Sequence, residues 1–584
     1  MSFDWRSQAQ TDRNPVAYLS MEIAVAPSMP TYSGGLGVLA GDTLRAAADM
    51  GLRMVAVTLV HRRGYFRQHL DANGTQTEEA QPWCPESLLA KEEPIVRLTI
   101  EGRTVAIRAW RYDLEGVTGH VIPIYFLDTD LDENSVEDRN LTDQLYGGDG
   151  DHRLKQEAVL GMGGARMLDA MGYVPVVYHM NEGHAALLTV ALLEQERHGA
   201  NIDSASDEDI ESVRQRCVFT THTPVPAGHD RFSPEQAERI LGQDRAHLLE
   251  RVGAYHDGLL NMTYVALRFS RFVNGVAMQH GKVSREMFPD YSISAITNGV
   301  HAGTWTSVPF QAAFDKHMPR WREDNIALRY AIDIPEAEIA AAHAEAKRAL
   351  LAAVKERTGS DLNPDIFTLG FARRAATYKR SDLLFHDPER LVRLAHEFGG
   401  LQILYSGKAH PADEPGKAMI RHVIEMAKQL NSDALKILYL ENYEWTLGAL
   451  LTGGVDLWLN TPKRPYEASG TSGMKAALNG VPSLSILDGW WIEGWIEGVT
   501  GWAISDHDEE GSEAGSLYDH LEQTVLPLYT KQPEQWQRIM RSTIALNGSY
   551  FNTQRMLEQY LLNAYFPENP VDSKTTDLEP ALAK

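Results

Sequence analysis

Apolar and polar positions alternate in short blocks through the first half of the chain. Residues 16–22, 53–60 and 174–180 form apolar runs of the length of single strands. Between such runs, residues 44–51 and 160–172 have the apolar spacing of helices. This order of strand, helix and strand predicts a mostly parallel β-sheet with helices on its faces, which is an α/β fold.

The same alternation returns in the second half, after a long helical segment. Residues 335–358 are rich in alanine with an apolar stripe, and their opening Ile-Pro-Glu-Ala-Glu is typical of a helix start. Beyond them, residues 366–374, 401–407 and 455–460 again have the pattern of strands. We therefore expect two α/β halves joined by a helical connector, with a cleft between them. Ligands of open α/β sheets bind beyond the carboxyl ends of the strands, so loops that follow strands are the first candidates for a site.

We place the boundary between the halves near residue 300. Residues 1–300 then form an N-terminal domain, and 301–565 form a C-terminal domain that begins with the helical connector at about 301–360. Residues 566–584 have little apolar content, so they are expected to be a disordered tail.

Composition excludes several classes of partner. The chain has 584 residues, with 55 Lys and Arg against 79 Asp and Glu, and its net charge of -24 opposes binding to nucleic acid or to an anionic membrane. Its two cysteines, Cys84 and Cys217, do not form a disulfide framework. The first residues lack the apolar core of a signal peptide, and no apolar run reaches the length of a membrane span. We therefore expect a cytoplasmic protein.

A lone lysine, Lys475, follows a run of glycine and small hydroxyl residues that begins at Glu467. Glycine-rich turns that enter a helix cradle phosphates with backbone N–H groups. The nucleotide-binding Walker pattern needs glycine directly before the lysine and Ser or Thr directly after it, but Met474 and Ala476 stand there. The stretch thus predicts an anion site and excludes a Walker nucleotide loop.

A second glycine-rich stretch, Gly35 to Ala40, contains the pattern Gly-x-Gly-x-x-Ala of dinucleotide-binding folds. The true fingerprint follows its strand at once and has an acidic residue at the end of the next strand, and neither condition is met here. We expect a helix start whose backbone approaches a ligand closely, with a tight structural turn as the alternative.

Basic side chains cluster directly after a predicted strand of the second half, at Arg373, Arg374, Lys379 and Arg380. Such runs are usually solvated surface. Their place at the carboxyl end of a strand, in a strongly acidic chain that would otherwise repel phosphate, favours an anion pocket.

Histidines give a weaker indication. His222 follows a strand, where it is either a reactive group or a satisfied structural residue. His179 and His184 lie five positions apart, which does not fit the helical zinc motif. The calcium-loop-like Asp149-Gly-Asp lacks the glutamate required at the twelfth position. We expect no metal.

Taken together, the motifs are far more specific than any one of them, because they occur in the order seen in one family. They are Tyr32-Ser-Gly-Gly-Leu-Gly, Arg153-Leu-Lys-Gln-Glu, Thr221-His-Thr, Val273-Asn-Gly-Val, Thr297-Asn-Gly-Val, Tyr378-Lys-Arg and Glu467-Ala-Ser-Gly-Thr-Ser-Gly-Met-Lys. From about residue 18 to residue 479, the chain resembles the α-glucan phosphorylases that act on glycogen, starch or maltodextrin, and looks like their short bacterial and archaeal branch.

The resemblance implies two Rossmann-like domains facing a central cleft, as in the GT-B glycosyltransferases. It implies pyridoxal 5'-phosphate bound covalently to Lys475, and inorganic phosphate and an α-1,4-glucan as substrates. The implied reaction is phosphorolysis of the non-reducing-end glucose to glucose 1-phosphate with retention, without the carboxylate nucleophile of a retaining glycosidase. The family also tends to form homodimers.

The family's functional residues match positions in this chain. Those implied in catalysis are Lys475, Arg374, Lys379 and His222. Those implied at the cofactor are Lys475, Thr471, Gly35, Trp305, Arg373, Tyr443 and Tyr65. Those implied at the glucan and phosphate are Gly34, Gly35, Leu36, Asn298, Glu467, Ser469 and Gly470.

Some positions depart from the long members of the family. Glu444 stands where those members have an arginine near the cofactor, and Lys463 or Arg464 is a candidate replacement. The loop at 145–152 is short, so we do not expect it to act as a gate. The sequence starts close to its first strand, so we do not expect control by phosphorylation of an N-terminal extension.

Two other functions remain open on the sequence alone. A nucleotide-sugar glucosyltransferase of the glycogen or starch synthase kind shares the bilobal fold and an early Gly-Gly-Leu-Gly loop, but it needs no covalent cofactor on Lys475. A catalytically silent glucan-binding protein would use the same sugar contacts without turnover.

Overall fold

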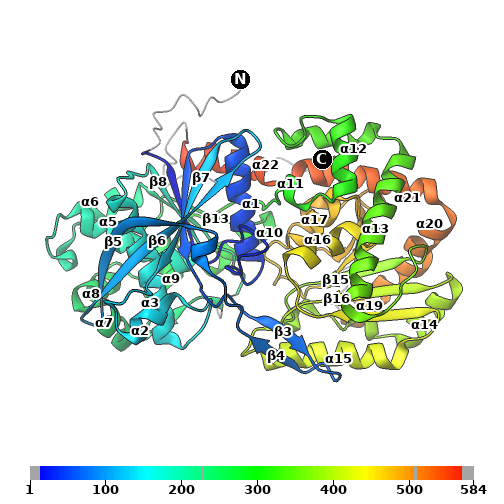
Figure 1. The fold of residues 1–584 in the computed structure, drawn as a ribbon, viewed down its shortest axis with the longest axis horizontal. Helices are drawn as coiled ribbons and strands as arrows, with labels where there is room; N and C mark the ends of the chain where they lie inside the picture. The colour runs from blue at the N-terminus through cyan, green and yellow to red at the C-terminus, as the bar shows by residue number, and fades with distance from the viewer. Residues whose placement is uncertain (1–12, 226–227, 505–509, 568–584) are drawn as a thin grey trace.

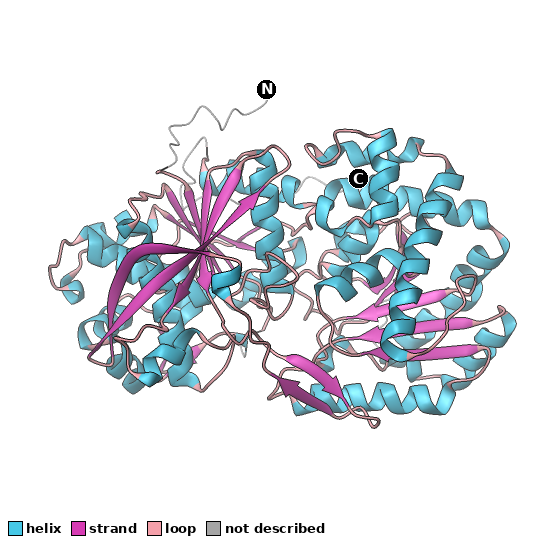
Figure 2. Cartoon of the chain, viewed as in Figure 1, coloured by secondary structure: helices cyan, strands magenta, loops and turns pink. Residues whose placement is uncertain are grey.

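The computed structural model describes residues 13–225, 228–504 and 510–567. Two large β-sheets, each flanked by helices, form the two sides of the molecule (Figures 1 and 2). The predicted α/β class is therefore confirmed. Of the tail expected to be disordered, residues 568–584 lie outside the described residues.

The first sheet has nine strands in the order β14-β13-β9-β8-β1-β2-β7-β6-β5. From β14 to β7 the strands run parallel, as the apolar runs predicted, and β6 and β5 add an antiparallel edge that was not predicted. The strands are β1 (Val16–Ser20), β2 (Met54–Leu59), β5 (Ala90–Ile100), β6 (Arg103–Glu115), β7 (Val121–Asp128), β8 (Val177–Asn181), β9 (Cys217–Thr220), β13 (Phe272–Gly275) and β14 (Ser294–Ala295).

Helix α1 (Gly35–Met50) begins at the predicted glycine turn and packs tightly against the chain that follows β1. A Cβ atom placed on Gly41 would lie 1.9 Å from the backbone oxygen of Ala24, so no larger residue fits there. The helix ends at Gly51, whose φ of 68° is left-handed, as is common at helix ends. The other main helices of this half are α3 (Gly150–Ala158), α4 (Gly164–Ala170), α5 (Leu188–Glu196), α6 (Asp207–Arg214), α7 (Pro234–Leu241), α8 (Gln243–Arg251), α9 (Met262–Arg268) and α10 (Met278–Met287).

The second sheet has six parallel strands in the order β17-β16-β15-β18-β19-β20. Counted along the chain, this is the order 3-2-1-4-5-6 of a doubly wound sheet, whose direction of winding reverses between β15 and β18. Loops after β15 and β18 therefore diverge at one edge. The strands are β15 (Thr368–Ala372), β16 (Leu401–Ser406), β17 (Leu435–Leu440), β18 (Leu457–Asn460), β19 (Ser483–Ile486) and β20 (Gly501–Ile504).

The predicted long helix is confirmed as α13 (Glu336–Thr358), with Pro335 before its first turn and the left-handed Gly359 after its last. The other main helices of this half are α11 (Ala302–Trp305), α12 (Val308–His317), α14 (Pro388–Glu397), α15 (Glu414–Leu430), α16 (Trp445–Gly454), α17 (Ser472–Leu478), α18 (Trp491–Gly494), α19 (Glu510–His520), α20 (Leu526–Lys531) and α21 (Pro533–Thr543).

The last described segments, α22 (Thr553–Tyr560) and the π-helical turn Leu561–Tyr565, return to the first sheet and pack beside α1 (Figure 1). The Tyr560 hydroxyl lies 2.9 Å from the Thr220 hydroxyl at the end of β9. The end of the predicted 301–565 domain thus contributes side chains to the core of the first half. The domain boundaries themselves stay a prediction.

A small hairpin of the first half, β3 (Arg67–Leu70) and β4 (Gln76–Glu79), lies against the second half near α15 (Figure 1). The Gln68 side-chain amide donates to the Gly407 carbonyl at 2.9 Å, and the Gln76 amide donates to the Ala409 carbonyl at 2.9 Å. Both glutamines are buried. The hairpin therefore fixes the loop after β16 to the first half.

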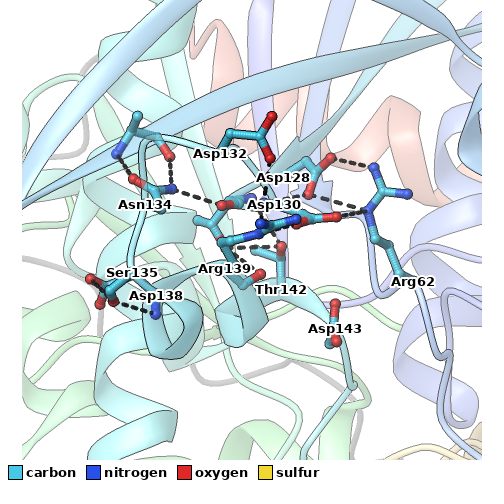
Figure 3. Close-up of polar contacts among 12 residues, drawn as sticks. Arg62, Asp128, Asp130, Asp132, Asn134, Ser135, Asp138, Arg139, Thr142 and Asp143 are labelled. Carbon is cyan, nitrogen blue, oxygen red and sulfur yellow. Dashed lines mark hydrogen bonds and ion pairs between the residues drawn. The ribbon is translucent and has the colours of Figure 1, made fainter.

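Figure 3 shows polar contacts around the end of β7 and the loop that follows it. Arg62 donates to Asp128 at 2.7 Å, and Arg139 donates to Asp130 at 2.6 Å, so arginines offset the charge of these carboxylates. The Asn134 side chain exchanges two hydrogen bonds of 2.8 Å with the Ala106 backbone of β6. This network fastens the loop after β7 to its neighbours.

Two further observations concern the residues that the structure describes. Within them, no group of three or more His, Cys, Asp or Glu side chains is arranged to hold a metal ion. Within the same ranges, no helix combines the length and the apolar character needed to cross a membrane.

Candidate active site

Lys475, in the middle of α17, lies where helices of both halves meet. Its Nζ atom is 3.6 Å from the centre of the Trp305 ring, and the Trp305 indole N–H donates to Asp42 Oδ2 of α1 at 2.7 Å. Asn479 fastens α11 to α17, because its side-chain amide donates to the Trp305 carbonyl at 2.8 Å and to the Lys475 carbonyl at 3.0 Å. The amine is thus held between the two halves.

Burial makes the Lys475 amine easier to deprotonate than a lysine in water. Removal from solvent lowers the pKa of Lys475 to about 8, and the nearby Asp42 charge opposes this shift. A desolvated lysine of this kind has a sizeable neutral fraction at physiological pH, which is the form that attacks carbonyl carbons.

The start of α17 leaves polar groups available for a ligand. Gly470 has a left-handed φ of 79°, which turns the chain into the helix. Thr471 occupies the N-cap position, but its side chain makes no capping hydrogen bond. The predicted turn of glycine and hydroxyl residues therefore leads directly to the helix of Lys475.

Glu467 pairs with two residues of the predicted basic cluster, Arg373 and Lys379. Its carboxylate accepts hydrogen bonds from Arg373 and, at 2.6 Å, from Lys379. Burial alone would raise the pKa of Glu467, but the charges of Arg373 and Lys379 outweigh it and hold that pKa at about 2. The Nε and Nη1 atoms of Arg373 are buried and have no hydrogen-bond partner in the described residues. Two buried cations thus share one carboxylate.

The other two basic residues do not pair with Glu467 in the contacts of the described residues. Arg374 is exposed, and its charge acts on Tyr65 and His410. Arg380 instead pairs with Glu513 and donates to the Thr461 carbonyl at 3.0 Å, so it serves the structure. Arg373, Arg374 and Lys379 also line a small cavity of about 10 Å³.

The glycine loop is held by one buried carboxylate of the segment after β1. Glu22 accepts hydrogen bonds from the Ser33 hydroxyl at 3.0 Å, the Gly34 N–H at 3.3 Å and the Tyr146 hydroxyl at 2.9 Å. A Cβ atom placed on Gly34 or Gly35 would have no heavy atom within 4 Å, so both border open space. Leu36, the third predicted residue of this loop, is half-buried.

The predicted sugar contacts follow strands β9, β14 and β18. His222 Nε2 lies 2.7 Å from Asn181 Oδ1, and burial lowers the pKa of His222 to about 4, so the ring is neutral at pH 7. The Oδ1 of Asn298 and the hydroxyl of Ser469 are buried and lack a partner in the described residues. Buried polar atoms without partners are costly unless a ligand satisfies them.

Two tyrosines flank the basic cluster. Burial raises the pKa of Tyr443 to about 12, and the Arg373 charge acts on its hydroxyl in the opposite direction. Tyr65 is buried and packs edge-on against Tyr146 with ring centres 6.4 Å apart. Of the residues predicted for the cofactor, Tyr443 therefore lies within reach of the Arg373 charge.

Glu444 does not fill the role of the family arginine. It caps α16 by accepting from the backbone N–H groups of Thr446 at 2.8 Å and Leu447 at 3.0 Å, and it pairs with Arg357 at 3.1 Å. Of the suggested replacements, Lys463 is exposed. The observed structure gives neither Lys463 nor Glu444 a place in the basic cluster.

Sequence reasoning missed Lys408, Asp42 and Glu22. Lys408 follows β16 and donates to the Phe66 carbonyl at 2.8 Å, and burial lowers its pKa to about 8. Its position after a strand was the one signal in the sequence. Asp42 and Glu22 are charged residues inside apolar segments, a pattern that indicates a buried partner.

Comparisons with known proteins identify the family of the chain. The family model described as carbohydrate phosphorylase matches residues 225–500. The maltodextrin phosphorylase of Thermococcus litoralis is 38% identical over 94% of this chain and 70% of its own length. The glycogen phosphorylase of Mycobacterium tuberculosis is 38% identical over 96% of this chain and 71% of its own length. That of Aquifex aeolicus is 33% identical over 95% of this chain and 86% of its own length.

These relatives are bacterial and archaeal, and the similarity extends over nearly all of the chain. The expected resemblance is thereby confirmed. The chain belongs to the carbohydrate phosphorylase family.

Proposed function

We propose that the protein is an α-1,4-glucan phosphorylase, which uses inorganic phosphate to release glucose 1-phosphate from the non-reducing end of glycogen or maltodextrin. One observation carries the proposal beyond family membership. The glycine turn that leads to the buried amine of Lys475 begins at Glu467, whose carboxylate is shared by two cations, Arg373 and Lys379. The proposal takes these cations as an anion site for the same ligand that the amine binds. In the proposed fold, two Rossmann-like domains face a central cleft that holds the site.

The residues present fit pyridoxal 5'-phosphate. Lys475 provides the amine for covalent attachment, and Arg373 has unpaired N–H groups for a phosphate. Gly34 and Gly35 leave space in front of α1. Thr471, Trp305, Tyr443 and Tyr65 complete the proposed binding set. When bound, the cofactor supplies a phosphate group that exchanges protons with the substrate phosphate.

Cations must offset the repulsion between two phosphates in one site. Two unit charges 4 Å apart repel by about 4 kcal/mol at the effective dielectric of a protein surface. Lys379 and Arg374 are the proposed ligands of the substrate phosphate, and Arg373 is the proposed ligand of the cofactor phosphate. Since Lys379 pairs with Glu467 in this structure, phosphate has to compete with that carboxylate.

Polar groups, of which only Glu467 is charged, are proposed to hold the glucose. Asn298 and His222 hydrogen-bond its 6-hydroxyl side, and Glu467, Ser469 and the Gly470 backbone hydrogen-bond its 3- and 4-hydroxyls. Since the neutral His222 ring donates its Nε2–H to Asn181 Oδ1, its Nδ1 is the atom that can accept a hydrogen bond from a sugar hydroxyl. Burial of these groups keeps water away from the anomeric carbon, which favours attack by phosphate.

Borohydride reduction followed by peptide mapping tests the proposal. Reduction should fix a pyridoxyl group on Lys475 in the wild type, and Lys475→Ala should carry none and produce no glucose 1-phosphate from maltodextrin. Lys475→Arg is the matched control, since it keeps the positive charge but cannot attach the cofactor.

Other outcomes separate the alternatives. Glucosyl transfer from a nucleotide sugar, with no pyridoxyl group on Lys475, would replace the proposal by a synthase-like activity. Glucan binding without turnover in the wild type would indicate a silent binding protein. Initial rates on maltose, short maltodextrins and glycogen would then define the substrate length. The cytoplasmic location and the homodimer stay predictions.

A further inference from the structure

Four side chains from four helices form one column that ends at Lys475. The Arg45 guanidinium lies 4.6 Å from the centre of the Trp445 ring. Trp445 stacks on Trp305, with ring centres 5.4 Å apart and planes at 24°. The Lys475 amine lies 3.6 Å from the centre of the Trp305 ring. The column therefore runs cation, ring, ring, cation.

Asp42 borders this column and is completely buried. Its Oδ2 atom accepts the Trp305 indole N–H at 2.7 Å. Its Oδ1 atom is buried, has no hydrogen-bond partner in the described residues, and lies 3.7 Å from the nearest Arg45 nitrogen. One carboxylate thus contacts both the ring that carries the Lys475 amine and the cation at the far end.

A buried carboxylate with one oxygen unpaired is unfavourable for folding. The desolvation penalty of a buried ion is several kcal/mol, and it is recovered only when the charge is well paired. A hydrogen bond to a carboxylate fixes the plane of the indole and increases the negative potential of its face. A cation on such a face is held more strongly when water is excluded. The arrangement therefore stabilises a cation at Lys475.

We propose that Asp42 is a positioning residue which, through the indole of Trp305, fixes the Lys475 amine and favours its protonated form, while Trp445 and Arg45 brace the indole from behind. The inference rests on the proposed function only for what Lys475 binds. The geometry itself does not depend on that function, so the two can fail separately.

Other charged groups near Lys475 are engaged elsewhere. The helices and strand packed against α17 are α11, α16, α21, the turn at residues 544–548, and β19. Of these only α21 carries charged residues, and its Arg541 and Arg538 pair with Glu336 at 3.5 and 3.6 Å. On α1, Asp49 pairs with His301 at 2.7 Å. Asp42 is the charge that acts on Lys475 in the described structure.

The test measures the reactivity of Lys475 in the full-length protein freed of cofactor. A limiting amine-directed reagent is applied between pH 6 and 10, and modification of Lys475 is quantified by peptide mass spectrometry. The wild-type midpoint is expected near pH 8. Asp42→Asn keeps an oxygen for the indole N–H but removes the charge, so its midpoint should fall by about one pH unit.

The matched control is Asp49→Asn, which removes a buried carboxylate from the same helix, because the charge of Asp49 acts on Arg45 but not on Lys475. Its midpoint should equal that of the wild type. A variant with the opposite expected sign is Arg45→Gln, because loss of the distant cation should raise the midpoint. An unchanged midpoint in folded Asp42→Asn would overturn the proposal.

Arg45→Gln keeps the test decisive if Asp42→Asn does not fold, since a lowered or unchanged midpoint in Arg45→Gln would also overturn it. If the modification midpoints of Asp42→Asn and Arg45→Gln change as expected but the wild type carries no cofactor on Lys475, the result counts against the proposed function alone. Normal cofactor attachment in Asp42→Asn, with the midpoint of the wild type, would count against the positioning role alone.

Discussion

Replacing Glu467 by glutamine tests how the charges of the anion site are balanced. The pKa of Glu467 is about 2 against an ordinary 4.5, and a difference of one in pKa corresponds to about 1.4 kcal/mol. Glu467→Gln should therefore lower the free energy of unfolding at pH 7 by about 3 kcal/mol. Glutamine keeps the shape of the side chain, so this loss reports the charge, which leaves Arg373 and Lys379 buried without a counter-ion.

The size of the thermal effect follows from the length of the chain. Unfolding entropy is about 2.1 cal/mol/K per residue, so 584 residues give about 1.2 kcal/mol/K. A loss of about 3 kcal/mol divided by this entropy should lower the midpoint temperature of unfolding by about 2–3 °C. Differential scanning calorimetry in buffer without phosphate or sulfate measures it. A lowered carboxyl pKa stabilises the folded state above the unfolded value of 4.5, and this stabilisation is lost as pH falls towards 2. The difference in free energy of unfolding between wild type and Glu467→Gln should therefore shrink as pH falls from 4.5 towards 2.

Phosphate should then stabilise the variant more than the wild type, because it no longer competes with Glu467. At a hundred times its dissociation constant a ligand adds about 2.7 kcal/mol. Glu513→Gln is the matched control, since Glu513 pairs with Arg380 and not with Arg373 or Lys379. Equal phosphate stabilisation of Glu467→Gln and wild type, or no loss of stability without phosphate, would refute the reasoning.

Three further outcomes are expected. Lys379→Ala should lose turnover by at least about a hundredfold while keeping bound cofactor, measured by absorbance of the holoenzyme, and loss of cofactor would mean that Lys379 serves the cofactor phosphate. Gln76→Ala should speed hydrogen exchange at the loop after Gly407 without changing exchange in the first sheet, and uniform acceleration would contradict a local fastening. Because burial holds the pKa of His222 at about 4, ionisation of His222 should not limit kcat/KM between pH 5.5 and 7, and a pH dependence in that range that His222→Asn abolishes would contradict this expectation.

Apolar runs predicted the parallel strands of both sheets because burial on two faces leaves a strong local signal. The hairpin β3–β4 gave no such signal. Its strands are four residues long and polar, and its partners, such as Gly407, lie more than 300 positions away in sequence. Local pattern cannot report a contact that exists only after the halves meet.

The candidate site likewise combines residues that the sequence located with contacts that exist only in the packed structure. Lys475, Arg373 and Lys379 stand beside recognisable motifs, so the motifs and the family resemblance located them. The pairing of both cations with Glu467 is tertiary, and so is the column behind Lys475. Arg380 has the same sequence context as Lys379 but turns towards Glu513, which only the packed structure determines.

The return of α22 to the first sheet has a consequence for synthesis of the chain. β14 ends at Ala295 and α22 begins at Thr553, so at about 5–20 residues per second the roughly 260 positions between them take about 13–50 s to translate. During that time the surface of α1 that later holds Met556, Leu557 and Tyr560 remains uncovered on the ribosome. The first half therefore has to wait for the second before its core is complete, and its apolar surface is a natural target for chaperones until then.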